Sequence, residues 1–367
     1  MNQRSWVRQV DFGFVGLLFL LSGLGLIVLW SASHGPEGAI SGYAGRQLRW
    51  MGLGVGVMAC AAALDYRYLQ KHAALLYAAN VAMLVLVLVA GRTSMGAQRW
   101  LSLGWFSLQP SELMKVTLGV TVAHLLSREP SAPPHGVRQL FLPAASTAVP
   151  LGLVLLQPDL GTSLLLGAVA GAVVLFQGVR RKVLLCVACA LLAAAPVGWG
   201  FLHEYQRQRV RTFLDPESDP LGAGYHIIQS KIAVGSGQLL GKGYLKGTQV
   251  HLQFLPERHT DFIFSVLAEE WGFLGSVVVL SLYALLVLWG LDIAAKARDS
   301  FGRLLAVGLT SILFFQVVVN AGMVTGMLPV VGLPLPLFSY GGSSVLTTYA
   351  IAGILLSIRI RRFSQAF

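Results

Sequence analysis

The sequence predicts an all-α, polytopic membrane protein with ten transmembrane helices and one long outer connection. Two observations support this prediction: 55% of the 367 residues are hydrophobic while only 12% are charged, and the mean hydropathy is +0.68. A single soluble core cannot bury so much apolar surface, so the bilayer must serve as the solvent for most of the chain. No internal repeat or separate soluble stretch interrupts the pattern, and we expect one membrane domain over residues 1–367.

Ten hydrophobic runs define the predicted spans, and each is long enough, or nearly so, to cross a bilayer as a helix of roughly 20 residues. They cover residues 12–33, 46–64, 72–91, 110–127, 140–156, 161–179, 183–203, 263–292, 303–326 and 343–358. The first run is treated as a span rather than a removed signal peptide, because no small-residue cleavage site follows it. Pro143 and Pro150 make the fifth span the least regular.

Positive charge predicts the orientation of the spans. If the N-terminus is cytoplasmic, every predicted cytoplasmic segment carries Lys or Arg, whereas the opposite short connections at 157–160 and 327–342 carry neither. This pattern obeys the positive-inside rule and places both termini in the cytoplasm. The net charge of +11 therefore does not indicate nucleic-acid binding, because the basic residues are spread among loops between spans.

One long connection, at about 204–262, is predicted on the outer side, where long loops are exempt from the charge rule. Residues 222–240 carry isoleucine and valine at helical spacing between glycines, which fits a short amphipathic helix at the membrane surface. A solvated loop is the alternative. The three cysteines all lie in apolar runs, so neither a disulfide framework nor a metal site is predicted.

Four polar clusters fall on the predicted outer side, and the first covers residues 96–115. Glu112 lies in the first turn of the helix that starts in this cluster, and Lys115 stands three residues on, where the two can pair. A lysine one turn into a membrane helix is costly unless it is partnered or faces water. The pair is therefore either functional or a structural ion pair. Arg99 lies beside Trp100, which also suits an interfacial aromatic belt.

The second cluster is the connection at 157–163, between the fifth and sixth spans. Its acid, Asp159, can cap the sixth helix, which is the commoner use of such a residue. It can also pair with Lys115 across a cavity. Both interpretations of Asp159 stay open at the level of sequence.

The third cluster immediately precedes the eighth span and contains Asp261. At the start of that span Asp261 can act as a plain helix cap. Arg258 and His259 beside it, however, form a titratable group of the kind found in functional sites. Glu269 and Glu270 lie deeper along the span, and we expect them to support helix packing or a polar cavity floor.

The fourth cluster is the segment 333–344, between the ninth and tenth spans. Its prolines and double glycine prevent a regular helix, so this backbone must be buried in protein or line an aqueous cavity. The double glycine also lets backbone N–H groups approach an anion ahead of a helix. The candidate binding residues here are Ser339, Tyr340, Gly341, Gly342 and Ser343.

Together the clusters predict a cavity on the outer side with one well-placed carboxylate and several cations. An anionic, lipid-linked substrate fits this description. The carboxylate of Asp261 could deprotonate an attacking hydroxyl, while Lys, Arg and helix N-termini could bind a diphosphate leaving group.

At these motifs the sequence resembles the SEDS family (shape, elongation, division and sporulation), and its RodA-like elongation branch more than its division branch. Five segments match in order and spacing and cover nearly the whole chain: GAQRWLSLGWFSLQPSELMK, QPDLGTS, GYHIIQSKIAVGSGQLLGKG, FLPERHTDFIFSVLAEEWGFLG and LPLPLFSYGGSS. The resemblance implies a ten-helix peptidoglycan glycosyltransferase for cell elongation and rod shape. Such an enzyme polymerises lipid II at the outer face of the bacterial inner membrane and releases undecaprenyl diphosphate.

The resemblance also implies roles for single residues and for partners. Asp261 matches the essential aspartate of the family, which we expect to act as general base in an inverting transfer. The family's further site residues match Arg99, Trp100, Glu112, Lys115 and Asp159. The implied partners are a class B penicillin-binding protein, which is a transpeptidase, and other elongation-complex proteins. No cofactor is certain: the acids permit a divalent cation, Mg²⁺ or Mn²⁺, but lack metal-ligand spacing.

Two other classes of function remain open. A transporter that flips lipid II would place charged residues deep inside several helices, connecting both faces of the membrane. A scaffold that recruits other enzymes of wall synthesis would tolerate substitution of the outer motifs. Because the polar clusters gather on one side, the sequence favours catalysis there.

Overall fold

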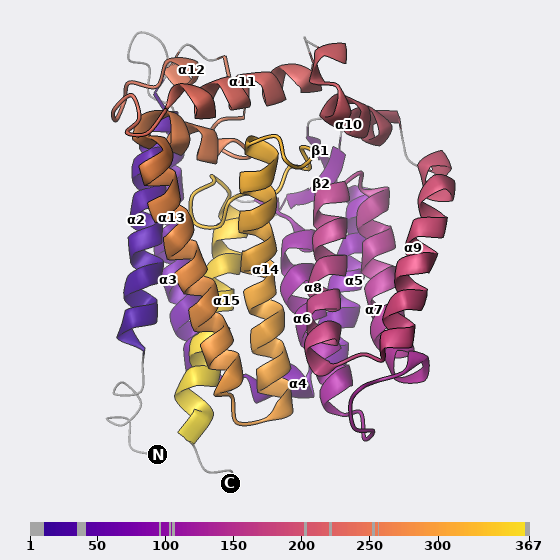
Figure 1. Cartoon of the computed structure of the whole chain (residues 1–367). Coiled ribbons are helices and arrows are strands. Elements are labelled where there is room, and N and C mark those ends of the chain that lie inside the picture. Colours follow the sequence, from indigo (N-terminus) through magenta and orange to yellow (C-terminus); the bar gives the residue numbers. More distant parts are fainter. Residues whose placement is uncertain are drawn as a thin grey trace.

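The computed structural model describes residues 11–34, 42–94, 97–102, 104, 107–201, 204–219, 222–251, 254–255 and 257–363. It shows a bundle of long, roughly parallel helices with short helices, strands and loops across one end (Figure 1). We call the end at which α13 begins the upper end, as drawn in Figure 1, and the opposite end, where α2 begins and α15 finishes, the lower end.

The first half of the chain contains α2 (Phe12–Ala32), α3 (Tyr43–Ala63), α4 (Arg67–Lys71), α5 (Ala73–Ala90), β1 (Arg92–Ser94), β2 (Ala97–Ser102), β3 (Ser107–Leu108), α6 (Pro110–Ser127), α7 (Val137–Leu156) and α8 (Leu160–Gln177). The second half contains α9 (Arg181–Phe201), α10 (Glu204–Leu214), η2 (Pro216–Ser218), α11 (Ala223–Ser236), α12 (Thr248–His251), α13 (Ile263–Ala295), α14 (Ser300–Val324), α15 (Gly342–Ile360) and η3 (Arg361–Phe363).

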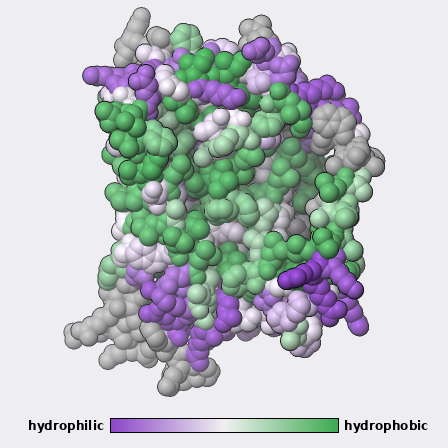
Figure 2. Space-filling view, in the orientation of Figure 1, coloured by the Kyte–Doolittle hydropathy of each residue, from purple (hydrophilic) through white to green (hydrophobic). Residues whose placement is uncertain are grey.

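A helix occupies each of the ten predicted spans. Seven of these helices are long and apolar enough to cross a membrane by length and composition: α2, α5, α7, α8, α13, α14 and α15. The other three, α3, α6 and α9, stand alongside them in the bundle (Figure 1). On the face drawn in Figure 2, an apolar band crosses the middle of the molecule, with polar residues gathered towards its two ends. A multi-pass membrane protein has this surface, because hydrocarbon surrounds its middle and water its ends.

The helix α14 lies at the centre of the bundle, where it packs against α13, α8 and α6. Leu304, Leu305 and Ala306 are each 0% exposed, and Val307 is 5% exposed. These residues point to different sides of the helix, and a helix that is apolar all round must be enclosed by other elements. Met323 and Val324 at the upper end of α14 are also 0% exposed, so the helix is enclosed up to the loops above it.

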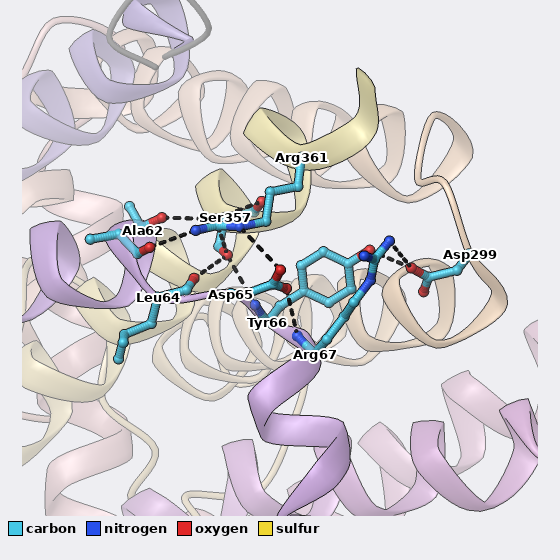
Figure 3. Close-up of polar contacts among 9 residues, drawn as sticks. Ala62, Leu64, Asp65, Tyr66, Arg67, Asp299, Ser357 and Arg361 are labelled. Atoms are coloured by element: carbon cyan, nitrogen blue, oxygen red, sulfur yellow. Dashed lines mark hydrogen bonds and ion pairs between the residues drawn. The ribbon is translucent and has the colours of Figure 1, made fainter. Parts of the chain in front are cut away.

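A second close helix pair, α3 and α15, is clamped at the lower end by a polar cluster (Figure 3). The guanidinium of Arg361 donates to the carbonyl oxygens of Ala62 (3.1 Å) and Ala63, the last residues of α3. The hydroxyl of Ser357 donates to Leu64 O at 2.6 Å. A cation at this place satisfies carbonyls that lack an intrahelical partner and complements the helix dipole. The two helices are thus fixed together, and their upper ends contribute to the candidate site.

The chain is not purely helical, and the all-α prediction is wrong between α5 and α6. There β1, β2 and β3 form a small antiparallel sheet in the order β1-β2-β3, in the connection between the third and fourth predicted spans. Trp100 lies opposite Arg92, and Leu101 lies opposite Leu108. Strands this short have little periodicity of their own, since it is the pairing with neighbouring strands that stabilises them.

The connection between α9 and α13 is largely helical and lies across the upper end of the bundle (Figure 1). Its helix α11 corresponds to the predicted amphipathic helix within residues 222–240. The segment after α11 docks where α13 is broken at Gly272, whose φ is +68°. There Lys242 N donates to Glu269 O and Gly243 N to Glu270 O, each at 3.0 Å. These bonds satisfy backbone groups that the break leaves without helical partners.

Glu269 has the supporting role expected of it. Its carboxylate is fully buried and accepts hydrogen bonds from Lys242 Nζ (2.7 Å), the Thr248 hydroxyl (3.1 Å) and Gln249 N (3.0 Å). The neighbouring Glu270 accepts from the Ser31 hydroxyl on α2. The two glutamates therefore hold the loop and α2 against α13.

Candidate active site

Asp261 lies in the turn that leads into α13. The helix begins at Ile263, and Phe262 occupies the N-cap position without a side-chain capping bond. Asp261 is therefore not the cap of this helix, contrary to the simpler sequence interpretation. Its side chain instead lines a pocket of about 310 Å³ at the upper end.

This pocket brings all four polar clusters together, although they are far apart in the sequence. Arg99, Trp100 and Glu112 come from the first cluster, Asp159 from the second, Asp261 from the third, and Tyr340 and Gly341 from the fourth. Glu257 also lines it, with its backbone in the left-handed region at φ +50°. A non-glycine residue in that region costs free energy and often marks a functional site.

Lys115 and Glu112 form a buried ion pair in the first turns of α6. Lys115 Nζ lies 2.7 Å from Glu112 Oε2, and the side chains are 1% and 4% exposed. The alternative pairing of Lys115 with Asp159 is wrong. Asp159 instead caps α8, accepting hydrogen bonds from Thr162 N (3.1 Å) and from the Thr162 hydroxyl (3.0 Å).

Arg99 holds the loop that precedes α8. Its Nε lies 3.8 Å from Asp159 Oδ2 and donates to Gln157 O at 3.3 Å, and its Nη2 donates to Pro158 O. Arg99 thus joins β2 to α8 at the rim of the pocket. Its side chain is 24% exposed, so it is also accessible to a ligand.

A second, larger pocket of about 730 Å³ adjoins the first, because both are lined by Trp100, Thr260, Tyr340 and Gly341. Three arginines line it: Arg46 and Arg49 from α3, and Arg92 from β1. Sequence reasoning missed all three. A signal was available, since two arginines near the start of a span on the outer side are not explained by the positive-inside rule.

The last cluster contributes to the wall of the larger pocket through Tyr340, Gly341, Gly342 and Ser343. Ser343 links the start of α15 to the strand region, because its hydroxyl donates to Ser107 O and accepts from Gln109 N, each at 3.3 Å. Ser339 is buried rather than exposed to either pocket, and its hydroxyl donates to Thr260 O at 2.6 Å. Ser339 therefore holds the backbone of Thr260, which lines both pockets.

His259 lines the larger pocket in an aromatic stack. Its ring lies 4.1 Å from that of Tyr43, at an interplanar angle of 14°. Burial lowers the pKa of His259 although the carboxylate of Glu257 opposes this, so the ring is neutral at pH 7. Arg258 turns away from both pockets and donates to Ala32 O (2.9 Å) and His34 O (3.2 Å) near the end of α2.

Two further side chains that the sequence did not single out hold the loops of the site. Asn320, on α14, donates from Nδ2 to Asp261 O (2.9 Å) and Leu333 O (2.8 Å). Gln47, on α3, donates to Ser339 O at 3.0 Å and accepts from Gly341 N at 3.3 Å. Polar residues inside apolar helices were the available signal for both.

The surroundings of Asp261 favour its protonated form. Burial raises the pKa of Asp261 to about 6, and the carboxylate of Glu257 adds to the rise, while the guanidinium of Arg209 opposes it. A carboxyl group that titrates near neutral pH suits general base catalysis, because it is ionised yet retains basicity at physiological pH.

Among cofactors, the sequence permits a divalent cation. Across the described residues, no group of three or more His, Cys, Asp or Glu side chains is arranged to hold a metal ion. Glu112 is paired with Lys115 and Asp159 caps α8, so their carboxylates are already committed.

Comparison with known proteins identifies the family. Residues 12–363 match the family model FTSW_RODA_SPOVE, described as "Cell cycle protein". The chain belongs to the FtsW/RodA/SpoVE family. Among family members, it is 48% identical over 365 residues to peptidoglycan glycosyltransferase MrdB of Escherichia coli (strain K12), covering 98% of this chain and 97% of the relative. It is 32% identical over 427 residues to peptidoglycan glycosyltransferase RodA of Treponema pallidum, covering 96% and 98%.

Solved structures of the family have the same fold. A chain from a structure described as "Structural coordination of polymerization and crosslinking by a peptidoglycan synthase complex" superposes with a TM-score of 0.82 at 38% identity, covering 97% of this chain and 99% of that one. The rod shape determining protein RodA of Thermus thermophilus superposes with a TM-score of 0.73 at 34% identity, covering 97% and 98%.

Proposed function

We propose that this chain is a peptidoglycan glycosyltransferase that polymerises lipid II into glycan strands for cell elongation and rod shape. The observation that carries the proposal is the pair of adjoining pockets at the upper end, one holding Asp261 and the other lined by three arginines. A base beside an anion-binding cavity is what the transfer of a sugar from a diphosphate requires. Relatives that match the chain over nearly its full length are named as such glycosyltransferases.

In the proposed topology all ten helices span the bacterial inner membrane and both termini are cytoplasmic. The basic segments at α4, between α13 and α14, and after α15 lie at the lower end (Figure 1), which supports a cytoplasmic lower end. The long connection at about 204–262 and both pockets then face outward. The chain forms one domain in this arrangement.

The proposed reaction is an inverting transfer with Asp261 as general base. The 4-hydroxyl of the acceptor GlcNAc attacks the anomeric carbon of the donor sugar, and a new C–O bond forms there. The bond from that carbon to the diphosphate breaks, and its electron pair leaves with undecaprenyl diphosphate. The hydroxyl proton passes to the Asp261 carboxylate. The proton transfer is the step that requires a carboxylate within hydrogen-bond reach of the attacking hydroxyl.

The diphosphate is assigned to the larger pocket. Arg46, Arg49 and Arg92 line it, and guanidinium groups bind phosphate oxygens with two hydrogen bonds each. The N-terminus of α15, which begins at Gly342, also faces this pocket and favours negative charge. A volume of about 730 Å³ lies within the range of pockets that hold organic ligands.

The implied partner is a class B penicillin-binding protein that crosslinks the strands, together with other elongation-complex proteins. The similar chain from a peptidoglycan synthase complex supports this assignment, because that complex is described as coordinating polymerisation with crosslinking.

Purified protein should convert lipid II into glycan polymer, and the rate should rise when the cognate partner is added. The measurement is gel separation of labelled lipid II products, with the partner alone as the control. Movement of lipid II across a liposome membrane without polymer would instead identify a transporter. A scaffold would give neither polymer nor movement of lipid II. In that case the complex with the partner would also keep full activity after the pocket residues are substituted.

The pH dependence of polymerisation should reflect Asp261. Because the pKa of Asp261 is raised to about 6 and the base must be ionised, kcat/KM should fall about tenfold per pH unit below that value. Glu257→Gln removes one cause of the rise and should move the midpoint to lower pH. Glu217→Gln, which changes an exposed acid in η2, is the matched control. A midpoint that stays unchanged in Glu257→Gln would contradict the electrostatic assignment.

A further inference from the structure

Asn320 is a polar residue in the most enclosed helix of the protein. It lies one turn before the end of α14 and is 0% exposed. Its Nδ2 donates to two backbone carbonyls in different segments, Asp261 O at 2.9 Å and Leu333 O at 2.8 Å. Because carbonyl oxygens only accept hydrogen bonds, the amide nitrogen must face them.

The other end of this amide is not satisfied. The buried Oδ1 of Asn320 has no hydrogen-bond partner within the described part of the chain. Buried polar atoms without partners are rare in folded proteins, and each is unfavourable for stability. An apolar side chain would avoid this cost, so the reason for an amide at this position lies in the two carbonyls that its nitrogen holds.

Those two carbonyls belong to the two segments that define the surroundings of the Asp261 carboxylate. The first is the peptide of Asp261 itself. The second adjoins Gly332, against which the carboxylate lies, since a Cβ at Gly332 would be 3.3 Å from Asp261 Oδ2. Gly332 has a φ of +75°, a backbone conformation that favours glycine. One carboxamide therefore joins the backbone of the proposed base to the wall beside it.

The remainder of the second segment is held independently on both sides of Leu333. Arg209 Nη1 donates to Val330 O at 3.0 Å, and the hydroxyl of Tyr283 donates to Pro336 O. With both flanks fixed, the segment is a stable reference for Asp261. The hydrogen bonds of Asn320 then fix the position of the turn that carries Asp261 relative to this segment.

We propose that Asn320 is a positioning residue for catalysis, which sets the Asp261 carboxylate at the distance from the sugar hydroxyl that proton transfer needs. The proposal rests on the glycosyltransferase function proposed above. Asn320 is not among the described residues that line either pocket, and it acts through the backbone of Asp261. A displacement of about 1 Å at a reacting group can lower a rate about 100-fold, so loss of these bonds should act on kcat.

The test compares Asn320→Leu with Gln316→Leu in full-length protein with its cognate partner. Gln316 is a matched control, because it lies on the same helix one turn earlier, is 2% exposed, and its Nε2 has no partner within the described residues. Asn320→Leu should lower kcat per folded molecule about 10- to 100-fold and leave KM within about twofold. Gln316→Leu should leave both constants within about twofold of the wild-type values.

The pH profile provides a readout that a purely structural role would not change. If Asp261 swings into water in Asn320→Leu, the midpoint of its acid limb should fall from about 6 toward the ordinary value for an aspartate. If Asn320→Leu does not yield folded protein, Asn320→Gln is used, since it keeps the amide but displaces it by one methylene. It should lower kcat in the same way.

Three outcomes separate the hypotheses. The positioning role is overturned if Asn320→Leu has the same kcat per folded molecule as the wild type. The same holds for Asn320→Gln where that variant is needed. A higher KM with unchanged kcat also overturns it, because it would make Asn320 part of substrate binding. If the wild-type protein forms no polymer with its partner, the proposed function itself is refuted. Loss of activity in the Asn320 variant alone does not refute that function.

Discussion

Asp261→Asn should abolish polymerisation of lipid II while the protein remains folded and inserted in the membrane. The amide has nearly the same shape as the carboxylate but cannot accept the proton of the attacking hydroxyl. General base catalysis contributes about 10²- to 10⁴-fold, so the rate should fall by at least about 100-fold. The measurement is polymer formation by purified protein with its cognate partner, normalised to folded protein from size-exclusion chromatography.

The matched control for this variant is Glu204→Gln on α10. Glu204 is also an acid at the upper end, but its side chain is 67% exposed and pairs with two arginines of its own helix, Arg207 and Arg211. It should retain wild-type activity. Polymerisation at the wild-type rate by Asp261→Asn would remove the base assignment, and equal losses in both variants would indicate a general effect of charge at this end.

Lys115→Met should cause a large loss of both stability and activity. It leaves the carboxylate of Glu112 buried without its partner 2.7 Å away. Breaking a buried ion pair in this way costs about 3–5 kcal/mol. The expected result is a marked fall in the thermal unfolding temperature of the purified protein in detergent, together with loss of polymer formation.

The double variant Glu112→Gln with Lys115→Met distinguishes a structural from a functional pair. It removes both charges, so most of the unfolding temperature should return. Activity should stay low, because Glu112 lines the pocket that contains Asp261. Recovery of activity along with stability would show that the pair only fixes the top of α6. The exposed pair Glu204 and Arg211 is the control, since its removal should change stability by less than about 1 kcal/mol.

The predicted spans agree with the structure because membrane crossing is a local property of the chain. A run of about 20 apolar residues satisfies its own backbone in a helix whatever surrounds it. The boundaries therefore differ by only a few residues in most cases, as in α14, predicted at 303–326 and found at Ser300–Val324. The small sheet at β1, β2 and β3 was missed because strand pairing involves separate segments of the chain.

The polar clusters were also visible in the sequence, since charged residues in an apolar chain stand out. Their partners were not. Lys115 pairs with Glu112, and Asp159 lies beside Arg99, whereas spacing allowed other choices. The sequence shows that a charged residue is present but does not show which partner it takes. The partners of Lys115 and Asp159 depend on how α6, α8 and β2 are placed relative to one another.

Hydropathy and motifs in the sequence were enough to predict the membrane fold class, the family and the position of Asp261 in a polar turn before a span. Hydropathy and motif spacing are local, and a linear chain displays them directly. The folded structure was needed to show that Arg46, Arg49 and Arg92 line a pocket beside that carboxylate. It was also needed to show that Asn320, 59 positions along the chain, holds the backbone of Asp261. These contacts depend on how helices pack, and long-range packing leaves no periodic signal in the sequence.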